Sequence, residues 1–160
     1  MKKRNKPNVA YAYTGDGGTS QGDFYEGMNF AGAYHAPAVF FAQNNGYAIS
    51  TPRSVQTKAP HLAAKGWAAG LPSFVVDGMD PIAMYLAAKE ARKWAVDGNG
   101  PVFIETITNR LGPHSMSGDD PLRYRTQEDI DNWTKREPLI RFRKYLTDRD
   151  LRSEEHTSEL

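Results

Sequence analysis

Two apolar segments with a helix-like segment between them constrain the fold of this chain most strongly. Residues 9–13 (Val-Ala-Tyr-Ala-Tyr) and 38–42 (Ala-Val-Phe-Phe-Ala) have the length and composition of buried β-strands. Residues 22–34 between them place apolar side chains at helical spacing, and these are Phe24, Met28 and Ala31. A strand, a helix and a strand within about 35 residues predict a right-handed βαβ unit whose two strands are parallel.

Polar residues follow each of the two predicted strands. Gly15-Asp16-Gly17 comes after the first strand, and Asn44-Asn45 comes after the second. Because parallel strands end at the same edge of a sheet, where open α/β sheets bind ligands, we expect Asp16 and Asn45 to lie side by side. A carboxylate oxygen and an amide oxygen are ligands that suit Mg²⁺.

The glycines beside Asp16 add a second element to this site. Gly17 and Gly18 have no side chain and precede the predicted helix, so backbone N–H groups there can approach an anion. A hard cation beside such a turn predicts a site for a diphosphate. Two ordinary tight turns, one after each strand, are the alternative interpretation of the same residues.

Strands and helices continue to alternate in the second half of the chain. We expect strands at residues 73–77 and 101–108, and between them a helix that Asp80 caps and Pro81 begins. The apolar stripe of this helix consists of Met84, Ala87, Ala88 and Ala91. The alternation predicts an α/β fold, a parallel sheet with helices on both faces.

The connection after the second strand is less regular. Pro52 is expected to prevent further strand pairing, because it has no backbone N–H. A short alanine-rich helix is expected at residues 58–69, with Ala63 and Trp67 on its buried face.

A long polar loop is expected from residue 109 to residue 125, after the carboxyl end of the last strand. Long loops in compact domains are usually either functional or disordered, and this one should lie at the same sheet edge as Asp16. We therefore treat His114 within it as a candidate site residue, whereas His35 and His61 are expected to have structural roles.

These motifs together resemble a known family. Gly15-Asp16-Gly17 followed, after residues 18–43, by Asn44-Asn45 resembles the thiamine diphosphate motif. The longer strings GDGGTSQGDFYEG at residues 15–27 and GPHSMS at residues 112–117 resemble the alpha subunit of the thiamine diphosphate-dependent pyruvate dehydrogenase component of the 2-oxoacid dehydrogenase complexes. The resemblance covers residues 5–151 and implies the thiamine diphosphate-binding fold.

The resemblance also implies roles for individual residues. Mg²⁺ would be held by the side chains of Asp16 and Asn45 and by the backbone carbonyl of Tyr47. His114 would touch the cofactor diphosphate and assist acyl transfer, as the catalytic residue of this chain. The cofactor-binding residues implied are Gly15, Asp16, Gly17, Gly18, Asn45, Tyr47 and His114. Gly46 departs from the pattern, because many members of the family have Arg there.

The activity implied is oxidative decarboxylation of pyruvate with transfer of the acyl group to a lipoyl group. The implied cofactors are thiamine diphosphate and Mg²⁺, and the cofactor itself carries the chemistry. The implied partners are a beta subunit in an α2β2 assembly and a lipoyl acyltransferase, in the cytoplasm of a bacterium. Three alternatives remain, namely a branched-chain 2-oxoacid or acetoin dehydrogenase alpha subunit, a transketolase-like enzyme, and a non-catalytic α/β nucleotide-binding module.

Two serines and two glutamates are the other polar residues with a possible connection to the site. Ser115 and Ser117 flank Met116 in a loop that resembles the phosphorylated loop of mitochondrial relatives. Glu26 and Glu105 are the carboxylates most easily mistaken for catalytic groups, and we expect them to serve helix-start electrostatics and a local pair.

Composition bounds these expectations. The 160 residues suit one domain, and a net charge of +1 gives no electrostatic case for binding nucleic acid or an anionic membrane. The chain has no Cys, so it forms no disulfide. We expect residues 1–151 to be part of a thiamine diphosphate-binding domain that continues upstream of Met1. Residues 152–160 match the translation of a sequencing adapter and are expected not to be native.

Overall fold

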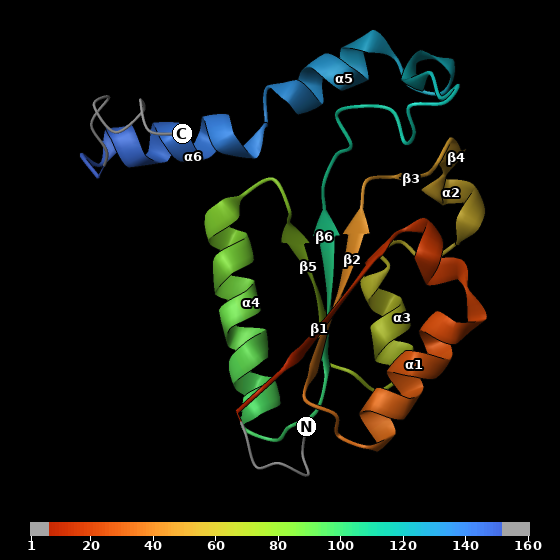
Figure 1. Ribbon diagram of the computed structural model, residues 1–160, viewed down its shortest axis with the longest axis vertical. Helices are drawn as coiled ribbons and strands as arrows, with labels where there is room; N and C mark the ends of the chain where they lie inside the picture. The colour runs from red at the N-terminus through yellow and green to blue at the C-terminus, as the bar shows by residue number, and fades with distance from the viewer. Residues whose placement is uncertain (1–6, 152–160) are drawn as a thin grey trace.

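A four-stranded parallel β-sheet forms the centre of the computed structural model, which describes residues 7–151 (Figure 1). In their spatial order the strands are β1 (Ala10–Gly15), β2 (Ala38–Asn44), β6 (Val102–Ile107) and β5 (Ser73–Asp77). β1 and β2 pair in parallel with Ala10 opposite Ala38, so the predicted βαβ unit is confirmed. The expectations for Met1 and for residues 152–160 lie outside the described residues.

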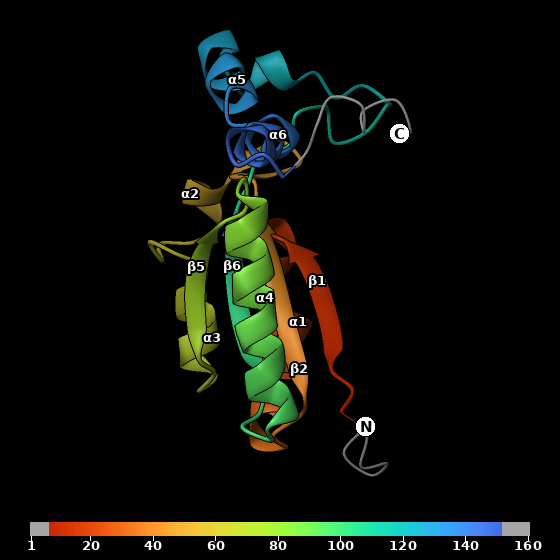
Figure 2. The same cartoon turned by 90° about the vertical axis from the view of Figure 1, so that its left-hand side faces the viewer.

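Helices cover both faces of this sheet, as predicted. α1 (Gly22–Ala33) and α3 (Ala63–Ala68) lie on one face, and α4 (Pro81–Val96) lies on the other (Figures 1 and 2). Residues of β6 alternate between the two layers. Phe103 packs with Met28 of α1, whereas Val102 and Ile104 pack with Ala91 of α4. The fold is therefore α/β, with a core on each side of the sheet.

The start of α4 agrees with the prediction in detail. The Asp80 carboxylate accepts hydrogen bonds from the backbone N–H groups of Ile82, at 2.9 Å, and Ala83, at 3.2 Å. Such a cap contributes about 1 kcal/mol to stability. Every member of the predicted apolar stripe lies in the core cluster on this face of the sheet, namely Met84, Ala87, Ala88 and Ala91.

The helix predicted at residues 58–69 is wrong in extent, and of its predicted buried face Ala63 is confirmed whereas Trp67 is wrong. The regular helix is α3 alone, because Pro60 disfavours a helical conformation at the residue before it and cannot donate a backbone hydrogen bond. Trp67 is 63% exposed, and its indole Nε1 donates to the Ser73 carbonyl at 2.9 Å. The buried residues of α3 are Ala63, Lys65 and Gly66.

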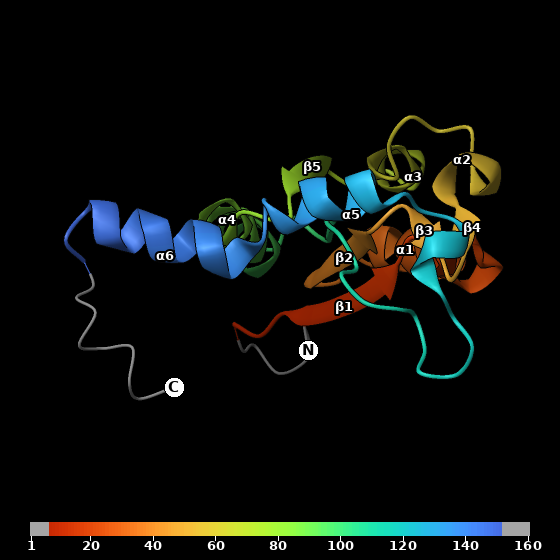
Figure 3. The ribbon, with the colours of Figure 1, turned by 90° about the horizontal axis from the view of Figure 1, so that it is seen from above.

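Loops and short elements gather at the carboxyl ends of the strands (Figures 1 and 3). They are the 3₁₀ turns η2 (Gly17–Ser20) and η3 (Pro121–Arg123), the hairpin strands β3 (Tyr47–Ala48) and β4 (Thr51–Pro52), and the helices α2 (Arg53–Gln56), α5 (Gln127–Thr134) and α6 (Pro138–Asp148). None of the helices between residues 7 and 151 is long and apolar enough to cross a membrane. Because these loops gather at the carboxyl ends of the strands, that edge of the sheet is where a site can form.

Candidate functional site

Asp16 directly follows β1 and begins the η2 turn. Asp16 is only 2% exposed, and its carboxylate accepts one hydrogen bond, from Gln56 Nε2 of α2 at 3.1 Å. No Lys, Arg or His of the described residues forms an ion pair with it. A nearly buried carboxylate whose only partner is a neutral amide keeps acceptor capacity for a cation.

The second turn of the site follows β2. Asn44 Oδ1 accepts from the backbone N–H of Gly46 at 3.0 Å, and Asn45 Oδ1 accepts from that of Tyr47 at 3.1 Å. Gly46 has φ of +84°, a conformation that glycine adopts without strain. These bonds fix the turn, and the amide oxygen of Asn45 retains a second lone pair for another ligand.

The Tyr47 carbonyl lies in the β3–β4 hairpin. Pro52 pairs with Tyr47 there, so the expectation that Pro52 prevents pairing is wrong. The ladder tolerates Pro52 because Arg53 supplies the next bond, from its N–H to the Gly46 carbonyl at 2.8 Å. Tyr47 and Pro52 therefore form a non-hydrogen-bonded pair of the ladder, in which each backbone carbonyl points away from the partner strand, so strand pairing does not occupy the Tyr47 carbonyl.

The hairpin packs closely against the turn at Asp16. A Cβ atom on Gly17 would lie 2.6 Å from Cβ of Ala48, and one on Gly18 would collide with the Thr14 side chain. The two glycines are therefore required for close approach of protein segments. They lie within η2, not directly before α1, and the expectation that their N–H groups meet a diphosphate stays a prediction.

The donor set assembled at this edge suits Mg²⁺. It comprises the Asp16 carboxylate, the Asn45 amide oxygen and the Tyr47 carbonyl, all hard oxygen donors. Mg²⁺ prefers six such oxygens and commonly takes the rest from phosphate groups and water. The residues present fit a magnesium–diphosphate group.

A cavity of about 300 Å³ lies beside this turn, under α5. Asn45 and Tyr47 line it together with His61 and Arg125. Asp16, Gly17, Gly18 and His114 do not line it, so the structure does not gather all the predicted site residues around one hollow.

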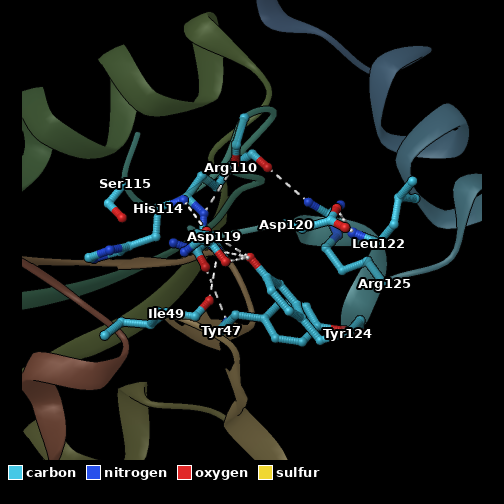
Figure 4. A network of polar contacts seen from close by, with 12 residues as sticks. Tyr47, Ile49, Arg110, His114, Ser115, Asp119, Asp120, Leu122, Tyr124 and Arg125 are labelled. Atoms are coloured by element: carbon cyan, nitrogen blue, oxygen red, sulfur yellow. Dashed lines mark hydrogen bonds and ion pairs between the residues drawn. The ribbon is translucent and has the colours of Figure 1, made fainter. Parts of the chain in front are cut away.

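The loop at residues 109–125 is tied to the hairpin by a polar network (Figure 4). Arg110 Nη2 donates to the Ile49 carbonyl at 2.7 Å and to the Tyr124 hydroxyl at 2.8 Å. The Tyr124 hydroxyl donates in turn to the Asp119 carboxylate at 3.0 Å. Tyr47 closes the network, because its hydroxyl donates to the Tyr124 carbonyl at 3.2 Å. The loop is therefore held on the segment that carries the Tyr47 carbonyl.

His114 lies in this loop with an exposed side chain. Its backbone N–H donates to the Asp119 carboxylate, and no hydrogen bond of the described residues joins its imidazole to Asp16 or Asn45. Its catalytic role stays a prediction. Of the other histidines, His35 adopts a positive φ of 47° after α1, and His61 lies 3.8 Å from Glu105.

Sequence reasoning missed two side chains that the site uses. Gln56 bonds to Asp16, and nothing in the sequence around it indicates that contact. Arg125 is 8% exposed and donates to the Arg110 carbonyl at 2.8 Å and to Asn109 Oδ1 at 2.7 Å. Its position near the end of a long polar loop was the only available indication.

We expect the Asp119 carboxylate to keep the loop at residues 109–125 ordered. The His114 N–H, assisted by Tyr124 and Arg110, holds the pKa of the Asp119 carboxyl below its ordinary value of 3.8, against the opposing effect of burial. Because the folded pKa is lowered, the stabilisation by Asp119 is complete above 3.8 and is lost as the pH falls through the folded value. Burial and the bond to Asp119 raise the pKa of Tyr124, so its hydroxyl stays protonated at neutral pH.

We expect Asp119→Asn to loosen the loop at neutral pH, because an amide offers one acceptor oxygen in place of two and removes the charge facing Arg110. Backbone amides of residues 110–125 should exchange hydrogen several-fold faster than in the unmodified protein. The difference in exchange rate between Asp119→Asn and the unmodified protein should narrow as the pH falls below 3.8. Asp131→Asn, an exposed acid on α5, should leave exchange in the loop unchanged, and equal exchange in both variants would contradict the anchoring role.

The sequence of this chain matches known proteins over its whole length. A family model described as "Dehydrogenase E1 component" matches residues 1–160. The chain is 59% identical over 160 residues to the "Pyruvate dehydrogenase E1 component subunit alpha" of Staphylococcus aureus (strain Mu50 / ATCC 700699) and 59% identical to that of Staphylococcus epidermidis (strain ATCC 12228 / FDA PCI 1200). Each match covers 100% of this chain and 43% of the relative, so the chain spans less than half the length of the relatives it matches. The resemblance drawn from the motifs is confirmed.

Proposed function

Because this chain belongs to the dehydrogenase E1 component family, we propose that it is the Mg²⁺- and diphosphate-binding part of a pyruvate dehydrogenase alpha subunit. The reaction is oxidative decarboxylation of pyruvate with transfer of the acyl group to a lipoyl group. The partners are a beta subunit, in an α2β2 assembly, and a lipoyl acyltransferase in the bacterial cytoplasm.

One observation carries the proposal. Asp16 places a nearly buried carboxylate, which has no cationic partner between residues 7 and 151, at the edge of the sheet against the hairpin that follows Asn45. Burying an unpaired carboxylate is costly, and a bound divalent cation offsets that cost. The neutral donors Asn45 and Tyr47 complement one acid without adding charge.

The proposed site residues have distinct tasks when the cofactor is bound. Thiamine diphosphate supplies the carbanion-stabilising chemistry, and the protein supplies binding and orientation. Asp16, Asn45 and the Tyr47 carbonyl hold Mg²⁺, while the backbone of the η2 turn meets the diphosphate. His114, presented by the anchored loop, serves the acyl-transfer end of the site.

Substrate choice tests the function directly. The full-length alpha subunit, assembled with its beta subunit, should release CO₂ from pyruvate in the presence of Mg²⁺, thiamine diphosphate and an artificial electron acceptor. A branched-chain 2-oxoacid and acetoin should be turned over much more slowly. Preference for either of these compounds would replace the pyruvate assignment, and absence of Mg²⁺-dependent cofactor binding would favour a non-catalytic module.

The loop offers a second test of function. We expect Ser115→Glu to depress activity several-fold, because Ser115 lines a cavity of about 510 Å³ together with the acids Asp119 and Asp120. A negative charge there repels the acid that anchors the loop and also a nearby diphosphate. Steady-state turnover of the assembled enzyme measures the effect. Ser115→Gln is the control of similar size and should retain most activity, whereas full activity of Ser115→Glu would contradict this mechanism.

A further inference from the structure

Two buried charged side chains lie beneath the candidate site without belonging to it. Glu105 on β6 is 0% exposed, and Lys65 on α3 is 6% exposed. No ion pair between residues 7 and 151 joins one to the other. Burying a charge is costly unless hydrogen bonds compensate for the lost water, so the partners of each side chain indicate what it does.

Glu105 connects the start of α3 to the turn after β2. One carboxylate oxygen accepts from Asn44 Nδ2 at 2.6 Å, and the other accepts from the backbone N–H of Ala63, the first residue of α3, at 3.0 Å. Asn44 holds the N–H of Gly46 with its own side-chain oxygen. Any movement of Glu105 is therefore transmitted to the turn that carries Asn45.

Lys65 connects the same helix to the turn after β1. Its ammonium donates to the backbone carbonyl of Thr19 at 2.6 Å and to the Thr19 hydroxyl at 3.0 Å, and it lies 5.3 Å from the centre of the Tyr25 ring. The Thr19 hydroxyl donates onward to the Asp16 carbonyl at 2.6 Å. Thr19 is fully buried, so this contact is shielded from water.

The short helix α3 is thus bonded to both halves of the site. Pairing of β1 with β2 ends at Gly15 opposite Gln43, and Asn44 pairs only with Ile107 of β6, so pairing between β1 and β2 does not extend to Asp16 and Asn45. We propose that Glu105 and Lys65 are positioning residues that, through α3, fix the separation of Asp16 and Asn45. Mg²⁺ demands near-ideal octahedral geometry at about 2.0–2.1 Å, so a small change in that separation weakens binding even when every ligand is present.

This inference rests on the proposed function, and it is tested on the full-length protein with Mg²⁺ and thiamine diphosphate. Lys65→Met keeps most of the length of the side chain but removes its donors. Glu105→Gln replaces one carboxylate oxygen with an NH₂ group, which then faces either the Asn44 Nδ2 or the Ala63 N–H, both of them donors. Each should raise at least tenfold the Mg²⁺ concentration that gives half-maximal cofactor binding, measured by calorimetry below the melting temperature. Thr19→Val removes the hydroxyl that links Lys65 to Asp16 and should have the same effect, which keeps the test decisive if another variant fails to fold.

Three controls separate positioning from general loss of stability. Lys89→Met and Glu90→Gln make the same chemical changes at exposed positions of α4 and should leave the Mg²⁺ requirement unchanged. Val102→Ala, buried at the opposite end of the sheet, should lower the melting temperature but keep the Mg²⁺ requirement within twofold. If Lys65→Met, Glu105→Gln and Thr19→Val behave like Val102→Ala, the inference is overturned while the proposed function stands. If the unmodified protein binds no thiamine diphosphate, the proposed function fails and takes the inference with it.

Discussion

Asp16→Ala is expected to lower Mg²⁺-dependent binding of thiamine diphosphate by at least about 100-fold, or ~2.8 kcal/mol, while the full-length protein remains folded. The variant removes the only anionic donor among the three proposed metal ligands. Stability of the cofactor-free protein should not fall and should even rise slightly, because Asp16 is 2% exposed and, among the described residues, its carboxylate has only Gln56 as a hydrogen-bond partner. A residue with a purely structural role would show the opposite pattern.

Calorimetric titration of the cofactor at several Mg²⁺ concentrations, combined with thermal unfolding, measures both effects. Asp148→Ala is the matched control, because Asp148 is exposed and pairs only with Lys144 at the surface. Such a surface pair contributes little to stability, so this variant should match the unmodified protein in both measurements. Unchanged Mg²⁺-dependent affinity in Asp16→Ala would remove Asp16 from the metal site.

The regular part of the fold was predictable because local sequence and tertiary packing agree there. Phe24 and Met28 recur at helical spacing on α1, and both pack against the sheet. Asp80 and Pro81 mark the start of α4 through interactions within one turn of the helix. Periodicity and capping are short-range properties, so the sequence displays them directly.

Prediction failed where distant residues decide the outcome. Trp67 was expected to be buried because it lies four residues after Ala63 on the predicted helix, but a bond to Ser73 holds it at the edge of the sheet while Lys65 is buried instead. The acceptor for Lys65 is Thr19, on another element far away in the sequence. Hydrophobic periodicity alone does not indicate a buried ammonium group.

The candidate site shows the same division between local and distant information. Asp16 and Asn45 were identified because each directly follows a strand, and parallel pairing places them at one edge. Glu105 was expected to form a local pair, yet it is fully buried and bonded to Asn44 and Ala63. Its role depends on how β6, β2 and α3 pack together, which the spacing of residues in the sequence does not specify.

Incompleteness of the site leads to the last prediction, that the 160-residue chain alone does not decarboxylate pyruvate. Its match covers only 43% of each relative, and several of its surfaces lack a cover in the described structure. No residue of α5 or α6 is buried, and Tyr13 of the edge strand β1 is 65% exposed. The resemblance to the family implies a divided site, and we propose that this chain holds the diphosphate end of the cofactor while the beta subunit holds the aminopyrimidine and supplies the carboxylate that helps to activate it.

The carboxylates of this chain do not replace the one expected from the beta subunit. Glu105 is buried in hydrogen bonds to the protein, and Glu26 is exposed on α1. A cofactor held at one end forgoes much of its contact area, so its affinity should also be weak.

CO₂ release by the purified 160-residue chain, at saturating Mg²⁺ and thiamine diphosphate with an artificial electron acceptor, should equal the background without protein. Activity should appear when the full-length alpha subunit and its beta partner are restored, which also shows that the assay works. Turnover by the short chain alone would contradict the division of the site between two subunits, because every group needed for catalysis would then lie within these 160 residues.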